Sequence, residues 1–278
     1  MILFSCSENS ETPVGETTGD TTLSEIAAMS FNVRYSGGDT GEHSWDNRKA
    51  ACLAMIAGTQ PTLIGMQEVR PDQKTFFEDN LKNYTIIGLA RDGSGSSTEY
   101  SSVCFRSDIF ILLDHGTFWL SATPDFMSKG WDGACHRICT WTKLRTKNSG
   151  KELFFFNTHI DHKGTEAQKQ GLWAIQEKIK QIAGDGAFVI LTGDFNMQPD
   201  NSNITGFATY MKSVRDQFPA GKYFSSPTFN GWGPSGSVID YIWYRNASPV
   251  SYEVINGLYS GITYISDHYP IMGKFSLQ

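Results

Sequence analysis

The stretch Phe188-Val189-Ile190-Leu191-Thr192-Gly193-Asp194-Phe195-Asn196 joins a continuously apolar run to a polar end. Short apolar runs of this kind are typical of strands buried on both faces, so Phe188–Leu191 predicts a central strand. An extended backbone points alternate side chains to the same side. We therefore expect Asp194 and Asn196 to face one cavity while Phe195 turns into the core. A tight turn is the alternative, since Gly, Asp and Asn all favour turns.

Two other polar runs, Asn157-Thr158-His159-Ile160-Asp161-His162 and Ser266-Asp267-His268-Tyr269-Pro270, also lie at the ends of apolar stretches. In the first run, alternation places His159 and Asp161 on one face and His162 on the other. A His that faces a cavity could donate to a phosphate or a leaving group, because its ionisation falls near physiological pH. We expect Asp161 to orient a neighbour and His162 to be structural.

Asp267 and His268 are adjacent, just before the strand that Pro270 introduces. Such a pair acts as a unit only if each side chain finds its own partner, for example a metal for the acid and another carboxylate for the imidazole. Asp240 is a suitable partner, because an acid inside the apolar run Val238–Tyr244 is costly unless it is paired. A buried Asp that orients a His serves in proton transfer. A purely structural ion pair is the alternative.

Glu68 and Asn32 close two further apolar runs near the start of the chain. Carboxylate and amide oxygens suit a hard divalent ion such as Mg²⁺ or Mn²⁺, whereas zinc would want more His or Cys ligands. Each residue alone is also compatible with a surface group at a strand end.

Apolar periodicity predicts a chain rich in strands with two helices, Trp45–Gly58 and Thr165–Ala183. The predicted strands are Ile26–Val33, Thr62–Val69, Tyr84–Leu89, Ser102–Arg106, Phe110–Leu120, Ile138–Arg145, Leu153–His159, Phe188–Leu191, Val238–Tyr244 and Ile271–Phe275. The simplest architecture is one α+β domain over residues 26–278, with sheet as its core and helices outside.

The chain has 278 residues, 40% of them hydrophobic, and a formal net charge of -6. This charge offers no global basic field for long nucleic acids, so a small substrate is favoured over a polynucleotide. No apolar run approaches the ~18 residues that would suggest a membrane span. The five cysteines are scattered, without the paired spacings of a zinc site.

The N-terminal run Leu3-Phe4-Ser5-Cys6-Ser7 is similar to the lipobox at which bacterial lipoproteins are lipidated on cysteine. The apolar stretch before Cys6 is shorter than a secretory signal, which would therefore be truncated. Ser7–Ser24 is polar and would suit a tether to a membrane anchor. We expect residues 1–25 to form a disordered tail that places the protein in the bacterial cell envelope, as a periplasmic or surface lipoprotein. A chance Cys in a tail is the alternative.

Taken together and in this order, six runs resemble the endonuclease/exonuclease/phosphatase superfamily. They are Ser30–Arg34, Gly65–Val69, Asn157–Asp161, Thr192–Asn196, Ile239–Tyr241 and Ser266–Pro270, and the resemblance spans roughly residues 26–278. It implies a DNase-I-like α/β/β/α sandwich, in which a two-sheet β-sandwich is flanked by helices and carries a metal-dependent cleft at one edge. It also implies direct hydrolysis, with Mg²⁺ or Mn²⁺ polarising the phosphoryl group while water attacks in line.

The resemblance further implies three groups of site residues. These are the metal region (Glu68, Asn32, Asp267), the phosphate contacts (His159, Asn196) and the catalytic residues (His159, Asp194, Asp240, His268). Asp194 would orient or deprotonate the water. His268, held by Asp240, would act as a base or as a transition-state stabiliser.

The substrate is less determined, because the family covers nucleases, sphingomyelinases, deadenylases, inositol-polyphosphate phosphatases and sugar-phosphate phosphatases. Thr117–Ser121 and Trp131–Trp141 look like a bacterial branch of hydrolases within it. Arg137 could clamp a phosphate bidentately or form a surface salt bridge. The aromatic residues in predicted loops, which could stack on a substrate or pack internally, are Trp45, Trp131, Phe229 and Trp232.

We predict hydrolysis of a small phosphorylated substrate, either a phosphomonoester such as a sugar phosphate or a phosphodiester. The first alternative is a nonspecific metal-dependent nuclease, whose binding to polynucleotides should depend strongly on salt. The second is a surface-anchored binding module without turnover. The intact set of Glu68, His159, Asp194 and His268 argues against it.

Overall fold

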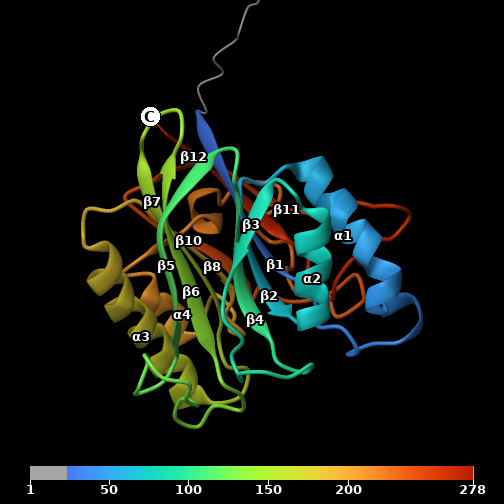
Figure 1. The fold of residues 1–278 in the computed structure, drawn as a ribbon, viewed down its shortest axis with the longest axis horizontal. Helices are drawn as coiled ribbons and strands as arrows, with labels where there is room; N and C mark the ends of the chain where they lie inside the picture. Colours follow the sequence, from blue (N-terminus) through green and yellow to red (C-terminus); the bar gives the residue numbers. More distant parts are fainter. Residues whose placement is uncertain (1–23, 278) are drawn as a thin grey trace, which may run out of the picture.

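Two six-stranded sheets pack face to face in the computed structural model, and helices cover both outer faces (Figure 1). The structure describes residues 24–277. The strand orders are β11-β12-β1-β2-β4-β3 and β5-β6-β7-β8-β10-β9. This confirms the predicted sandwich with outer helices.

The elements have the following bounds. The first sheet contains β1 Glu25–Asn32, β2 Leu63–Val69, β3 Tyr84–Ile87, β4 Tyr100–Arg106, β11 Ser248–Val254 and β12 Ile271–Ser276. The second contains β5 Phe110–Trp119, β6 Ile138–Thr146, β7 Glu152–His159, β8 Val189–Asp194, β9 Lys212–Ser213 and β10 Asp240–Arg245. The helices are α1 Trp45–Thr59, α2 Pro71–Asn80, α3 Thr165–Ala183 and α4 Ser202–Phe207, with 3₁₀ turns at Gly41–His43 and Arg215–Gln217.

All the strands and both helices that the sequence predicts are present, with small differences at their ends. Four elements were not predicted, namely α2, α4, β9 and β11. Helix α2 buries only Gln73 and Phe77, so its sequence has no apolar period to detect. Its start is instead fixed by Pro71 and by the Gln73 side chain, which accepts from the Arg70 N–H. Strand β11 is an irregular edge strand with a bulge after Pro249.

The predicted N-terminal tail, with its lipidation at Cys6, falls almost wholly on residues 1–23, outside the described residues. Within the part of the chain that is described, no helix has both the length and the apolarity to cross a bilayer.

Two parallel strand pairs form the centres of the sheets. Strand β1 pairs with β2, and the connection between them contains α1. Strand β7 pairs with β8, and the connection between them contains α3. Parallel strands end at the same edge of a sheet, so the polar residues that close them are brought together. Asn32 aligns with Gln67, and His159 aligns with Asp194. Asn32, Glu68, His159 and Asp194 therefore lie at the ends of the four central strands, which is why each of them follows an apolar run in the sequence.

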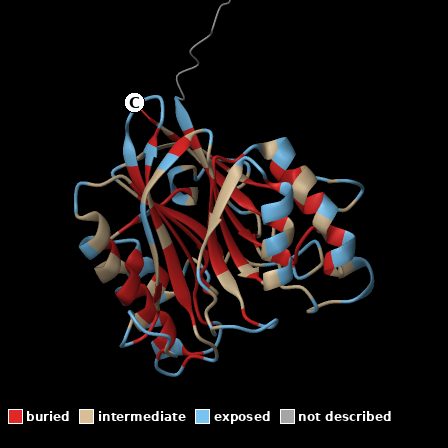
Figure 2. Cartoon of the chain, viewed as in Figure 1, coloured by how far each residue is buried: buried red, intermediate tan, exposed pale blue. Residues whose placement is uncertain are grey.

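Three apolar clusters fill the three interfaces between layers. Successive side chains of a strand point to opposite faces and so belong to different clusters. On β8, Ile190 packs between the two sheets, while Val189 and Leu191 pack toward α3 and α4. On the other side, Met29 and Phe31 of β1 pack with residues of α1 and α2. Figure 2 shows the buried residues along the strands and on the inner sides of the helices. Full burial of one such Leu, Ile or Phe side chain contributes about 1.5–3 kcal/mol.

A buried polar network joins the two sheets close to the edge where these strands end. Asn157 Oδ1 accepts from Gln67 Nε2 at 2.7 Å and from Thr192 Oγ1 at 3.0 Å. Its Nδ2 donates to the carbonyl oxygens of Met66 and Ser102 across the interface. Gly65 leaves room for this network, since a Cβ there would lie 2.0 Å from Thr192 Oγ1. The network fixes β2 of one sheet against β7 and β8 of the other.

Candidate active site

A cleft of about 650 Å³ opens where the central strands end. Seven of the nine predicted site residues line it, and these are Glu68, Arg137, His159, Asp194, Asn196, Asp267 and His268. The other two, Asn32 and Asp240, are buried and hydrogen-bond to lining residues. The fold therefore brings the complete predicted set together from seven separate segments.

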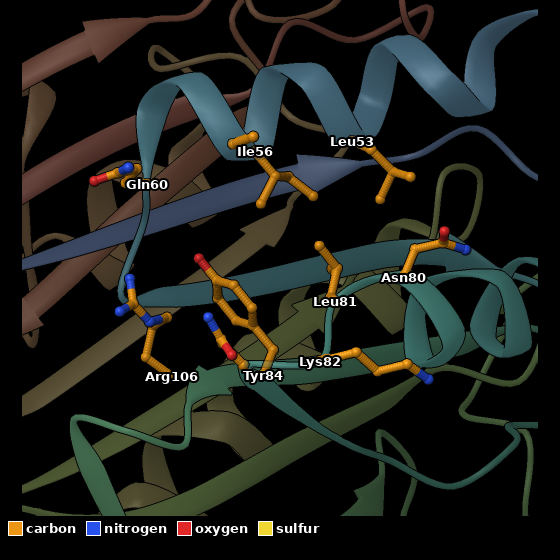
Figure 3. Close-up of a pocket in the computed structure, with 10 residues that line it drawn as sticks. Leu53, Ile56, Gln60, Asn80, Leu81, Lys82, Tyr84 and Arg106 are labelled. Carbon is orange, nitrogen blue, oxygen red and sulfur yellow. The ribbon is translucent and has the colours of Figure 1, made fainter.

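A second hollow, of about 430 Å³, lies between α1 and β3 (Figure 3). Its lining includes Leu53, Gln60, Leu81, Tyr84 and Arg106, and contains neither a carboxylate nor an imidazole. It therefore offers no acid–base pair, in contrast to the first cleft.

Asn32 connects two carboxylates that come from different sheets. Its Nδ2 donates to Glu68 Oε1 at 3.1 Å and to Asp194 Oδ2 at 3.0 Å. Its Oδ1 accepts from the backbone N–H of Arg34 at 3.0 Å, which fixes the orientation of the amide. Glu68 Oε2 accepts from the N–H of Tyr35. The two acids are thus held side by side at the interface of the sandwich.

Glu68 adopts a backbone conformation that is unusual for a strand residue. Its φ is +60°, in the left-handed region, and the β2–β4 register shifts between Met66 and Val69. A non-glycine residue in this region costs about 1–3 kcal/mol, and such strain collects at functional sites. The strain here accompanies a carboxylate that lines the cleft.

The side chains that could hold a metal form one well-suited group. Ligand atoms of Glu68, His159 and Asp194 lie within 4.8 Å of one another. A second group, Asp194 with Asp240 and His268, is equally compact, but there Nδ1 of His268 is already hydrogen-bonded to Asp240. Two carboxylates with one imidazole suit a hard or borderline divalent ion. The first group therefore fits a divalent metal by its donor chemistry.

Asp194 is almost completely buried, and this changes its protonation. Burial raises the pKa of its carboxyl to about 7; charged His268 opposes the rise, while Asp240 and Glu68 add to it. A carboxylate with a pKa near neutrality can both accept and return a proton at physiological pH.

For His268, the neighbouring charges outweigh burial and favour the charged form of the side chain. Its Nδ1 lies 2.9 Å and 3.1 Å from the two carboxylate oxygens of Asp240, and its Nε2 lies 3.7 Å from Asp194 Oδ2. Burial disfavours the charged ring, but Asp240 and Asp194 outweigh it and raise the pKa to about 10. The ring of Phe229 meets the imidazole edge to face at 5.0 Å. His268 is therefore a buried imidazolium at neutral pH.

His159 and Asn196 form a neutral pair on the cleft wall. The two side-chain nitrogens, His159 Nε2 and Asn196 Nδ2, lie 3.0 Å apart. Burial, assisted by the nearby Arg137, lowers the pKa of His159 well below its ordinary value. Asn196 and Asp194 both line the cleft while Phe195 is fully buried, as the sequence predicts. The backbone there is the turn alternative, because β8 ends at Asp194, Asn196 has a φ of +53°, and its N–H donates to Asp194 Oδ1.

The predicted placement of His162 is wrong. It lines the same cleft as His159, whereas Asp161 points away from it and accepts four backbone N–H bonds, from Ala134, Cys135, Lys163 and Gly164. Strand β7 ends at His159, so strict alternation no longer applies beyond it. The expectation that Asp161 orients neighbouring groups agrees with this geometry.

Several lining residues were not predicted. Arg34, Tyr35, Arg70, Arg91 and Glu99 come from the segments that follow β1, β2 and β3. Arg34 Nη1 lies 3.5 Å from Asp267 Oδ2. Arg34 lies inside a motif that the sequence singles out, and its charge was the available signal. Arg91 lies just before the Gly/Ser-rich stretch 92–98, outside the motifs that the sequence singles out, and gave no such signal.

Among the predicted loop aromatics, only Phe229 reaches the cleft. Trp45 packs against Phe76 and Phe77, and Trp232 stacks on His43 outside it.

Comparison with known proteins agrees with this geometry. The model of the endonuclease/exonuclease/phosphatase family matches residues 29–268. The chain belongs to the endonuclease/exonuclease/phosphatase family. Its members are metal-dependent phosphoester hydrolases, and this chain is an enzyme of that class.

Solved structures of the family cover nearly the whole chain. A Bacteroides vulgatus member is 30% identical with a TM-score of 0.83, covering 92% of this chain and 100% of its own. A mannosyl-6-phosphatase of Bacteroides thetaiotaomicron is 29% identical with a TM-score of 0.82, covering 91% and 100%. An uncharacterised mimivirus protein is 30% identical over 62% of this chain and 67% of its own length. The family fold thus extends over the described residues.

Proposed function

We propose that this enzyme hydrolyses a small phosphoester, a phosphomonoester such as a sugar phosphate or a small phosphodiester, with Mg²⁺ or Mn²⁺. The observation that carries the proposal is the convergence of Glu68, Asp194 and the Asp240–His268 pair on one cleft. The likeness to a mannosyl-6-phosphatase supports a sugar phosphate as the kind of substrate.

In this proposal the metal is held by the acidic part of the cleft. Glu68 and Asp267, which both line the cleft, would supply carboxylate oxygens, and Asn32 would keep Glu68 and Asp194 in position. When bound, the ion would polarise the phosphoryl group and offset the charge that develops on the leaving oxygen.

The protein groups would divide the remaining work. Asp194, whose pKa is raised to about 7 by burial, would orient the water and accept its proton. His268, kept charged by Asp240, would stabilise the negative charge on the phosphoryl oxygens in the transition state. His159, Asn196 and Arg137 would hold the oxygens that do not react. Water then attacks in line, and no covalent enzyme intermediate is required.

A substrate screen tests the proposal. The purified protein with Mg²⁺ or Mn²⁺ is offered phosphomonoesters, small phosphodiesters, plasmid DNA and RNA, beside Asp194→Asn and the surface control Asp185→Asn. We expect hydrolysis of small esters that a chelator abolishes, that Asp194→Asn loses and that Asp185→Asn keeps. Hydrolysis indifferent to chelator would refute the mechanism. A preference for plasmid over every small ester, with strong salt dependence, would favour the nuclease alternative instead.

We also propose that Cys6 carries a lipid that anchors the enzyme in a bacterial envelope. The lipobox-like run before Cys6 and the polar segment after it support this placement. The test is metabolic labelling with a fatty acid, in cells that express the wild-type chain or Cys6→Ala behind a complete signal peptide. Absence of Cys6-dependent label would contradict it.

A further inference from the structure

One charged side chain of the cleft has no partner for most of its hydrogen-bonding groups. Arg137 is 6% exposed, and its Nε and Nη1 make no hydrogen bond to any of the described residues. Only Nη2 is engaged, with His162 Nδ1 at 3.2 Å. A buried, unsatisfied guanidinium is costly, so its presence on a cleft wall points to an anionic ligand.

Asp161 lies within ion-pair distance of Arg137 but makes no hydrogen bond to it. Asp161 Oδ2 lies 3.9 Å from Nε, beyond hydrogen-bond distance. Both oxygens of Asp161 are already occupied by backbone N–H groups. By contrast, Arg34 pairs with Asp39 and Arg91 pairs with Glu99. Among these three arginines of the cleft, Arg137 is the one without a hydrogen-bonded carboxylate.

The segment that carries Arg137 is fixed at two points. Asp161 holds the backbone of Ala134 and Cys135, and Asp132 accepts from the N–H groups of Glu166 and Ala167 in the first turn of α3. A Cβ on Gly164 would lie 2.5 Å from Asp132 Oδ1, so the glycine permits this attachment. Arg137 is therefore preorganised and does not swing freely into solvent.

These contacts decide between the two substrate classes left open above. A terminal phosphate is a dianion with three free oxygens, so its charge can compensate the buried guanidinium of Arg137 while other oxygens face the catalytic residues. A diester replaces one of these oxygens with an ester oxygen that bears carbon, and it carries only one negative charge. A diester would therefore compensate the buried charge of Arg137 less well, and it has only two free oxygens to share between Arg137 and the catalytic residues, so we expect the site to discriminate against it.

We infer that Arg137 is a charge-selecting residue of this cleft and that the substrate is a phosphomonoester. The inference rests on the proposed hydrolysis and names its substrate class. The water oxygen bonds to phosphorus, the ester P–O bond breaks, the alcohol leaves with a proton, and inorganic phosphate is released.

Paired substrates test the inference. We compare 4-nitrophenyl phosphate with methyl 4-nitrophenyl phosphate, for the wild type, Arg137→Met, Arg137→Lys and the exposed control Arg145→Met at the far end of β6. We expect wild-type kcat/KM to favour the monoester. In Arg137→Met, kcat/KM should fall about 100-fold for the monoester and less than about 10-fold for the diester, because charged hydrogen bonds are lost only with the monoester. Arg137→Lys should recover part of the loss, and Arg145→Met should resemble the wild type.

The outcomes separate this inference from the proposed function. Equal losses of Arg137→Met on both esters, or a wild-type preference for the diester, would overturn the inference while leaving metal-dependent hydrolysis intact. Hydrolysis of neither ester would refute the proposed function itself. If Arg137→Met does not fold, competitive inhibition of the wild type tests the charge selectivity of the cleft instead. Inorganic phosphate should then inhibit at least about 10-fold more strongly than dimethyl phosphate, and equal inhibition would overturn the inference.

Discussion

Asp240 Oδ2 lies 2.9 Å from His268 Nδ1, and both side chains are buried. The carboxylate sets the orientation of the ring and keeps it charged, because it is the strongest of the influences that raise the pKa of His268. The pair is therefore one hydrogen-bonded unit, built from the start of β10 and the segment before β12.

Asp240→Asn should keep the fold and lose activity. The asparagine can still contact the ring, but it cannot stabilise the imidazolium, so kcat should fall about 10²- to 10⁴-fold with a small change in KM. The measurement is steady-state kinetics on the best substrate, with exposed Asp216→Asn as the matched control. Unchanged kcat in a folded Asp240→Asn would contradict a role for the pair in catalysis.

Stability of the metal-free protein should depend on pH through His268. The pKa rises from 6.5 to about 10 on folding, so the folded state holds the proton more tightly. The resulting stabilisation is fully present below pH 6.5 and is lost as the pH rises toward 10. We therefore expect the free energies of unfolding of the wild type and His268→Gln, measured in urea with chelator present, to converge as the pH rises across this window. The exposed control His115→Gln should show no such convergence with the wild type. A difference in the free energy of unfolding between the wild type and His268→Gln that stays constant with pH would exclude the link between His268 protonation and stability.

Glu68→Gln should weaken the metal site. The substitution removes a carboxylate charge but keeps the shape, so Mn²⁺ affinity should drop by at least about 100-fold, and activity should drop with it. Calorimetric titration with Mn²⁺ measures this directly, and excess Mn²⁺ should restore part of the activity. Exposed Glu166→Gln is the control. Wild-type Mn²⁺ affinity in Glu68→Gln would place the metal elsewhere.

Gly65→Ala should destabilise the sandwich. The new methyl group would lie 2.0 Å from Thr192 Oγ1 and 2.4 Å from Asn157 Oδ1, so the polar network between the sheets must shift. We expect the free energy of unfolding to fall by about 1–3 kcal/mol or more, as for other overpacked cores. Gly186→Ala, where nothing lies within 4 Å, should change it by less than about 0.5 kcal/mol. Equal stabilities of the two variants would argue against tight packing at Gly65.

The sequence predicts the strands and the strand-end chemistry well, because period and polarity are local signals. Asp194 and the Asp240–His268 pair lie where the strand pattern and the cost of burying an acid place them, whereas Asn196 reaches the cleft through a turn. His162 was misplaced, because the chain leaves the strand after His159 and local alternation ends. The unpaired state of Arg137 could not be foreseen either. It depends on Asp161, and only the folded chain shows that this carboxylate is occupied by backbone groups.

The pairing of β12 with β1 joins the last strand of the chain to the first. Asn32 and Glu68 are synthesised early, but His268 comes within the final eleven residues of the sequence. During translation the growing chain thus holds its acidic residues long before it acquires the imidazole beside them. The cleft is therefore complete only after β12 has paired with β1, so assembly of the site depends on a contact between strands that lie far apart in the sequence.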